Sequence, residues 1–110
     1  MTIYIENKKK YKGIGVYIGR PSILGNPFTH LNRESTLAKY QCLTRDESII
    51  KYEEYFYIML EKDSEFKREV ERLVLIAEER DLHLVCWCTP KSCHGNIIKK
   101  YIEKRIKDNA

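Results

Sequence analysis

An apolar stretch that runs through a short turn into a basic, amphipathic segment limits the folds open to this chain more than any other feature. Leu84 to Cys88 is apolar and β-forming, and Thr89-Pro90 ends the strand. Ser92 can cap a following helix, whose apolar positions recur at helical spacing: Ile97, Ile98, Tyr101, Ile102 and Ile106. α/β proteins place ligands at such strand-to-helix junctions. The segment therefore predicts an α/β fold with a site at this turn.

The start of that helix predicts an anion site. Cys93, His94 and the backbone N–H groups of Gly95 and Asn96 are expected in its first turn. N–H groups there have no partner within the helix, and the positive end of the helix dipole lies beside them. We therefore expect this turn to attract a phosphate, a carboxylate or a thiolate.

The remaining elements follow from periodicity and turn residues. Strands are expected at 2–6, 15–19 and 82–88, and a long loop at 20–41 with a short helix near 37–40. The capping box Thr44-Arg45-Asp46-Glu47 begins a helix with the apolar face Ile49, Tyr52, Phe56, Met59 and Leu60. Asp63 or Ser64 begins another, which buries Phe66, Val70, Leu73 and Ala77. This order predicts one domain over residues 1–110, a small three-layer Rossmann-like α/β domain with a short, mostly parallel sheet.

Two loops are expected to converge in this fold. If the strands near Tyr17 and Val85 are parallel neighbours, the loops that follow them leave the same edge of the sheet. In the first loop, Arg20 offers a planar fork of donors for a phosphate, and Ser22 and Asn26 offer neutral hydrogen bonds. The predicted ligand-binding residues are Gly19, Arg20, Pro21, Ser22, Gly25, Asn26 and Phe28 from the first loop, and Cys88, Thr89, Lys91, Ser92, Cys93, His94, Gly95 and Asn96 from the second. Tyr17, Phe28 or Trp87 could stack on a flat ring, although Trp87 also suits a core position.

Composition and charge limit the binding partners and the cellular location that we expect. The 110 residues carry 20 Lys and Arg against 16 Asp and Glu, a net charge of +4. Basic residues gather at Lys8-Lys9-Lys10, Lys12 and the last helix, but this excess is modest for a nucleic-acid domain, so direct nucleic-acid binding is the less favoured reading. The first residues lack the pattern of a secretory signal, and no apolar run is long enough for a membrane span. We expect a cytoplasmic protein with reduced cysteines and no membrane partner.

The cysteines leave two alternatives open. Cys86, Cys88, Cys93 and His94 could hold zinc, but their Cys-x-Cys-x4-Cys-His spacing differs from the usual knuckle, so no metal or cofactor is expected. Cys93 or Cys88 could instead be a nucleophile with His94 as acid or base. The arginine that cysteine phosphatases carry six positions after the cysteine is absent after both.

Two segments resemble a known family. Gly19-Arg20-Pro21-Ser22 through Leu24-Gly25-Asn26-Pro27-Phe28, and Cys86-Trp87-Cys88 through Pro90 and Cys93-His94-Gly95, are similar to the domain of unknown function family 4326 of small bacterial and bacteriophage proteins. Arg45-Asp46-Glu47 also fits, and the resemblance extends from about Val16 to Tyr101. It implies a compact Rossmann-like domain, often phage-borne, with its shared polar residues on the two loops. A phage setting implies host interaction or counter-defence, including capture of a nucleotide signal.

Together these features predict binding of a phosphorylated small molecule, a nucleotide or a nucleotide-derived signal. The alternative from another class is a small hydrolase or transferase that acts on a nucleotide-like substrate through a cysteine. A third hypothesis is a protein-partner inhibitor that uses the tyrosine-rich segment with Tyr40, Tyr52, Tyr55 and Tyr57. Pairing of two copies through an exposed first strand is also open.

Overall fold

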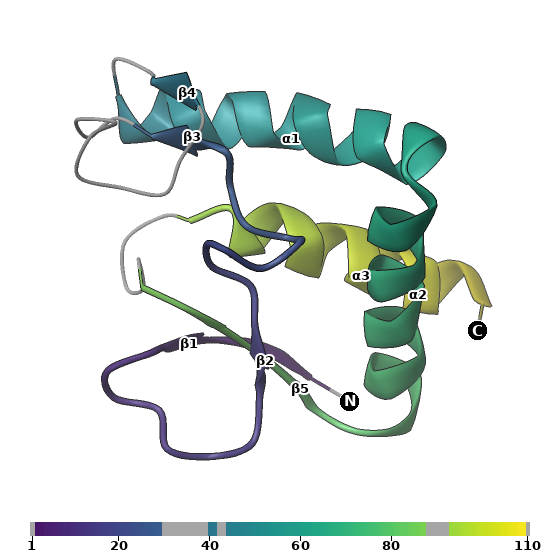
Figure 1. The fold of residues 1–110 in the computed structure, drawn as a ribbon. Helices are drawn as coiled ribbons and strands as arrows, with labels where there is room; N and C mark the ends of the chain where they lie inside the picture. The colour runs from purple at the N-terminus through teal and green to yellow at the C-terminus, as the bar shows by residue number, and fades with distance from the viewer. Residues whose placement is uncertain (1, 30–39, 42–43, 88–92, 110) are drawn as a thin grey trace.

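A computed structural model describes residues 2–29, 40–41, 44–87 and 93–109 (Figure 1). The sequence predictions for Cys88, Thr89, Lys91 and Ser92, and for most of the short helix near 37–40, lie outside these residues.

The main sheet has three parallel strands. β1 (Ile3–Asn7) and β2 (Val16–Tyr17) flank β5 (Leu82–Cys86), in the order β1-β5-β2. Tyr17 pairs with Val85, so the predicted parallel neighbours are confirmed. The ends of β2 and β5 therefore lie at the same edge of the sheet.

A second small sheet occupies part of the stretch predicted as a loop. β3 (Phe28–Thr29) pairs in parallel with β4 (Tyr40–Gln41), so the helix expected near 37–40 does not include Tyr40. Strands of two residues are too short to show a period in the sequence, which is why this pairing could not be predicted.

Three helices follow the predicted pattern: α1 (Arg45–Lys62), α2 (Ser64–Glu79) and α3 (Gly95–Asn109). The Thr44 side chain accepts from the N–H of Glu47, and the Asp63 carboxylate accepts from the N–H groups of Glu65 and Phe66. The helix starts expected at these two caps are confirmed. No helix among the described residues is long and apolar enough to cross a membrane.

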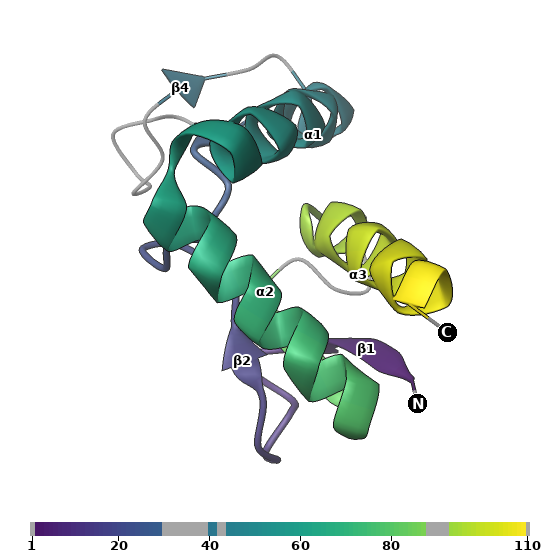
Figure 2. The ribbon, with the colours of Figure 1, turned by 90° about the vertical axis from the view of Figure 1, so that its right-hand side faces the viewer.

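All three helices bury side chains in one core, which lies on one face of the main sheet. Ile3, Leu84 and Cys86 belong to this core together with Phe56, Val70 and Ile102 of the helices. In both ribbon views α3 lies between α1 and β1 (Figures 1 and 2).

The opposite face, here called the outer face, carries the alternate strand residues Tyr4, Glu6, His83, Val85 and Tyr17. The connection between β1 and β2 folds over part of it, since a Cβ added to Gly15 would meet the Val85 side chain at 2.8 Å. The small α/β domain with a parallel sheet is confirmed. Its expected third layer is not found among the described residues, because the β1–β2 connection is too short to supply a helix to the outer face.

Candidate functional site

The described part of the second predicted loop, from Cys93 on, meets the beginning of the first loop at the edge of the sheet where β2 and β5 end. The Ile18 N–H donates to the Val85 carbonyl, which continues the β2–β5 ladder by one residue at 2.9 Å. The Ile18 carbonyl in turn lies 2.6 Å from Nε2 of His94, at the start of α3. This hydrogen bond joins residues 76 apart in sequence and holds the first loop against the helix start.

His94 is a neutral, buried imidazole in this position. Only 5% of the residue is exposed. A carbonyl oxygen can only accept, so Nε2 carries the proton and Nδ1 bears the lone pair. Burial lowers the pKa of His94, more strongly than the bond to Ile18 raises it, and the Arg20 cation lowers it further. Arg20 is thus near enough to His94 for its charge to be felt.

Acid should therefore destabilise the fold through His94. The unfolded chain binds a proton near pH 6.5, whereas folded His94 stays neutral to lower pH, so stability falls as pH drops below about 6.5. The contribution is at most about 1.4 kcal/mol per pH unit. Urea unfolding between pH 7.5 and 5.5 measures this contribution, and His94→Gln is expected to flatten the dependence of stability on pH. An equal slope in wild type and His94→Gln would contradict this assignment.

Arg20 is fixed within its own loop. Its Nη1 donates to the carbonyls of Asn26 at 2.8 Å and Phe28 at 3.3 Å. Among the described residues, Nη2 and Nε of Arg20 have no hydrogen-bond partner. The guanidinium is consequently fixed through Nη1, and Nη2 and Nε remain as donors that the described residues do not use.

The loop is also tied to α1. Asn26 is buried, accepts from the Phe28 N–H at 2.9 Å and donates Nδ2 to the Ser48 carbonyl at 3.3 Å. The Tyr52 hydroxyl donates to the Leu24 carbonyl at 2.7 Å. Burial raises the pKa of Tyr52 well above its usual range, so the phenol stays protonated as the donor. The 19–28 loop is thus an ordered part of the fold.

Ser22 is the exception within this loop. Its backbone is paired, with its N–H donating to Gly19 at 2.8 Å and its carbonyl accepting from Gly25 at 2.9 Å. Its Oγ is buried and makes no hydrogen bond in the described structure. An unpaired buried hydroxyl is costly, which makes Ser22 a candidate for a ligand contact.

The start of α3 differs from the expectation in two respects. The helix begins at Gly95, so Cys93 and His94 precede it and do not lie in its first turn. The N–H groups of that turn are also already used. Cys93 Sγ accepts from the Gly95 N–H at 3.2 Å, and the Cys93 carbonyl accepts from the Asn96 N–H at 3.0 Å. Both N–H groups predicted to bind an anion are therefore used inside the turn. Gly95 is buried against Ile18 and Ile5, and only Asn96 is exposed. The charge of the helix end remains available, but these two donors do not.

The cysteines are packed into the core. Cys93 is 2% exposed, and its Sγ lies 3.1 Å from that of Cys86 and 4.0 Å from Nδ1 of His94. Among the described residues no group of three or more His, Cys, Asp or Glu is arranged to hold a metal ion. Cys88, the remaining member of the zinc alternative, lies outside those residues.

The chain matches the family model of the domain of unknown function family 4326 over residues 3–104. The chain belongs to this family. No curated protein and no solved structure matches it. Both segments on which the resemblance was based lie within the matched residues. The hydrogen bond between His94 and Ile18 joins the described part of the second segment to the residue that precedes the first.

Aromatic residues of this family 4326 domain lie beside the loop. The Trp87 indole is 53% exposed, contrary to a core position, and donates to the Tyr17 hydroxyl at 3.0 Å. That hydroxyl donates to the Arg20 carbonyl at 2.7 Å. Phe28 is half-buried and lies edge-on to Tyr55. Trp87 is thus the predicted ring contact with the most accessible surface.

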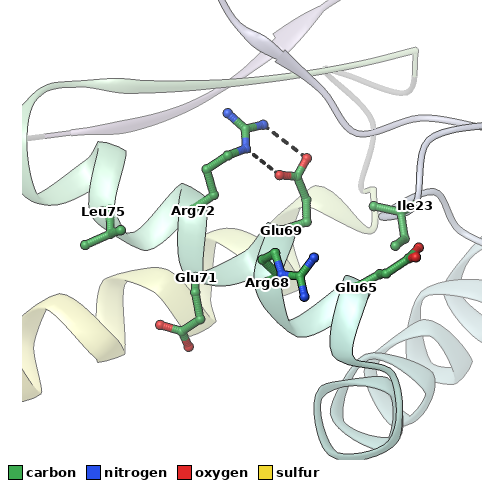
Figure 3. A pocket seen from close by; sticks show the side chains of 7 residues that line it. All are labelled: Ile23, Glu65, Arg68, Glu69, Glu71, Arg72 and Leu75. Carbon is green, nitrogen blue, oxygen red and sulfur yellow. Dashed lines mark hydrogen bonds and ion pairs between the residues drawn. The ribbon is translucent and has the colours of Figure 1, made fainter.

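A separate hollow lies along α2, where Ile23 of the first loop meets the helix (Figure 3). Its volume is about 540 Å³. Arg72 binds Glu69 through two hydrogen bonds, the longer of 3.0 Å, and Glu71 binds Arg105. Since these charges already pair with one another, the hollow is a weaker candidate than the edge of the sheet.

Sequence reasoning missed two participants in the site. Tyr52 was assigned to the core, yet its hydroxyl fixes the loop through Leu24. A tyrosine within an apolar stripe needs a partner for its hydroxyl, and that is the signal that could have revealed it. The Ile18 carbonyl has no such signal, because backbone groups cannot be told apart in a sequence.

Proposed function

We propose that this family 4326 domain binds a phosphorylated small molecule, a nucleotide or nucleotide-derived signal, at the edge of the sheet where β2 and β5 end. The observation that carries the proposal is Arg20, whose Nη1 is anchored on two carbonyls. Anchoring leaves Nη2 and Nε, a pair of donors spaced for two phosphate oxygens, without a partner among the described residues. A donor pair held in place before binding loses little entropy when a ligand arrives.

Ser22 and the charges of the loop support the same ligand. The unpaired Ser22 Oγ can donate to a phosphate oxygen. The chain carries no Asp or Glu from residue 19 to residue 29, so no carboxylate of the loop itself opposes an anion. The positive end of α3 adds to the favourable potential.

The exposed Trp87 suits the other half of a nucleotide. Its ring is fixed by the bond to Tyr17, which is itself bonded to the Arg20 backbone. Tyr17 thus links Trp87 to Arg20, so one nucleotide could place its base on the Trp87 ring and its phosphate on the Arg20 guanidinium. In this proposal the protein is a cytoplasmic, phage-borne binder that captures a nucleotide signal as counter-defence.

An enzyme that uses Cys93 is the second candidate, since His94 Nδ1 bears a lone pair 4.0 Å from the sulfur at the start of a helix. Burial argues against it, because Cys93 is 2% exposed and a substrate could not reach its sulfur. Alkylation by iodoacetamide separates the two. Modification of the folded protein at Cys93, with loss of turnover of a nucleotide substrate, would favour the enzyme.

The tyrosines on which the partner-inhibitor hypothesis depends are only partly exposed. Tyr52 is fully buried and Tyr55 is half-buried, so of the α1 tyrosines only Tyr57 is well exposed, at 48%. A hot-spot cluster needs several aromatic residues close together.

The Ser22→Ala variant should separate stability from binding. Removing an unpaired buried hydroxyl leaves the free energy of unfolding unchanged or raises it by up to about 1 kcal/mol, whereas it removes one ligand contact. Ser48→Ala is the matched control, because the Ser48 hydroxyl donates to Arg45 at 2.8 Å and its loss should cost about 1 kcal/mol. Urea unfolding measures both, and a destabilised Ser22→Ala would show that this hydroxyl already has a partner.

Thermal denaturation with matched ligand pairs tests the function. We expect AMP, cyclic AMP or NAD⁺ to raise the Tm, and adenosine or nicotinamide riboside to raise it much less, since binding only to the folded state stabilises it. Sodium chloride at equal ionic strength controls for salt. Equal shifts with and without the phosphate would contradict a site built on Arg20.

A further inference from the structure

The outer face of the sheet carries a column of stacked rings that the proposed site does not use. The His83 imidazole stacks on the Tyr4 ring at 4.8 Å and 12°, and on the Tyr11 ring at 5.1 Å and 17°. Tyr4 and His83 are cross-strand neighbours on β1 and β5. Tyr11 comes from the connection between β1 and β2. We call Tyr4, His83 and Tyr11 the aromatic column.

The column is accessible from solvent. Tyr4 is 42% exposed, and the His83 side chain is 26% exposed. Large aromatic side chains usually lie in the core, and here the helices cover only the opposite face of the sheet. A flat ring exposed at the end of a stack offers a surface to another flat ring.

A dense positive charge lies at the end of β1. Lys8, Lys9, Lys10 and Lys12 are all exposed, and the chain carries no Asp or Glu from residue 7 to residue 29. Lys8 lies over the ring of Tyr17 on the same outer face, 5.6 Å from its centre. The Glu6 carboxylate, which shares that face, is bonded to Nδ1 of His83 at 2.7 Å. We call Lys8 to Lys12 the lysine turn.

We propose that the outer face binds single-stranded nucleic acid, with unpaired bases stacking on the aromatic column and the backbone phosphates lying along the lysine turn. Rings on an open sheet face beside lysines are the combination that single strands require, because an unpaired base exposes its flat face whereas a duplex hides it. The lysines fit a polyanion, and their charge is what selects this partner over an uncharged apolar one. This surface is distinct from the proposed small-molecule site at Arg20.

Fluorescence anisotropy with a fluorescein-labelled 20-mer of single-stranded DNA, and with the same sequence as RNA, tests the proposal on the full chain. Wild type should bind both and prefer them to the duplex. Tyr4→Ala should weaken binding about tenfold or more, and Tyr4→Phe, which keeps the ring, should bind as wild type does. The double variant Lys9→Ala/Lys10→Ala should reduce the slope of log affinity against log salt by about 1 to 1.5.

Matched controls lie on the helices. Tyr57→Ala on α1 removes a tyrosine as exposed as Tyr4, and Lys67→Ala on α2 removes an exposed lysine; both should bind as wild type does. Arg20→Lys should also keep oligonucleotide binding, so the result does not depend on the small-molecule site. Loss of affinity in the control variants equal to that in Tyr4→Ala would overturn the proposal, as would wild type that binds anionic phosphatidylserine vesicles but no oligonucleotide.

Discussion

Arg20→Ala should weaken binding of the phosphorylated ligand by about a hundredfold or more. In the proposed complex, Arg20 donates two charge-assisted hydrogen bonds to the phosphate, each worth about 1.5–3 kcal/mol, and the variant would lose both. It also frees the carbonyls of Asn26 and Phe28 that the guanidinium holds, so part of the loss comes from a less ordered loop. Calorimetric titration with the ligand that gives the largest thermal shift measures the change.

Two variants separate these contributions. Arg20→Lys keeps the positive charge but not the fork of donors, so its affinity should fall between those of wild type and Arg20→Ala. Arg68→Ala, at an exposed position on α2, removes a distant cation and should bind as wild type does. If Arg20→Ala and Arg68→Ala lost equal affinity, the effect would be one of net charge and Arg20 would have no direct contact.

His94→Ala should lower the free energy of unfolding by about 3–5 kcal/mol. It leaves a cavity beneath Tyr52, whose ring lies edge-on to the imidazole at 4.9 Å, and it orphans the buried Ile18 carbonyl. The same change releases the start of α3 from the end of β2. Urea unfolding at pH 7.5 measures the loss.

His83 provides the comparison for that variant. It lies on the outer face, is partly exposed, and contacts Tyr4, Tyr11 and Glu6. His83→Ala should cost no more than about 1.5 kcal/mol, because water can replace its hydrogen bond and little core volume is lost. Equal costs for the two variants would mean that the His94–Ile18 bond does not anchor the site.

The sequence was sufficient to predict the helices and the central strand, because each shows a clear apolar pattern or a capping residue. The capping residues Thr44 and Asp63 mark the starts of α1 and α2, and the apolar run at Leu84 marks the central strand. Parallel pairing of Tyr17 with Val85 followed from their order along the chain, so the edge of the sheet at which the candidate site lies could be expected. These features are local or depend on general rules of connection.

The details of the site could not be predicted because they depend on contacts between distant residues. The sequence suggested that the Gly95 N–H would donate to a bound anion, but in the structure this N–H donates to the Cys93 sulfur. It left Trp87 open between a ring contact and a core position, and the residue is exposed because no described helix covers the outer face. The role of Tyr52 in holding Leu24 depends on a loop 28 residues away.

The most direct test of the small-molecule site is an NMR titration of the ¹⁵N-labelled protein with AMP and, separately, with adenosine. A phosphate site at Arg20 should give saturable shifts with AMP at the Arg20 Nε–H, at the Ser22 N–H and at the other backbone N–H groups of the 19–28 loop, with much weaker shifts from adenosine. Shifts confined to Lys8–Lys12, or shifts of equal size with adenosine, would contradict a phosphate site at Arg20.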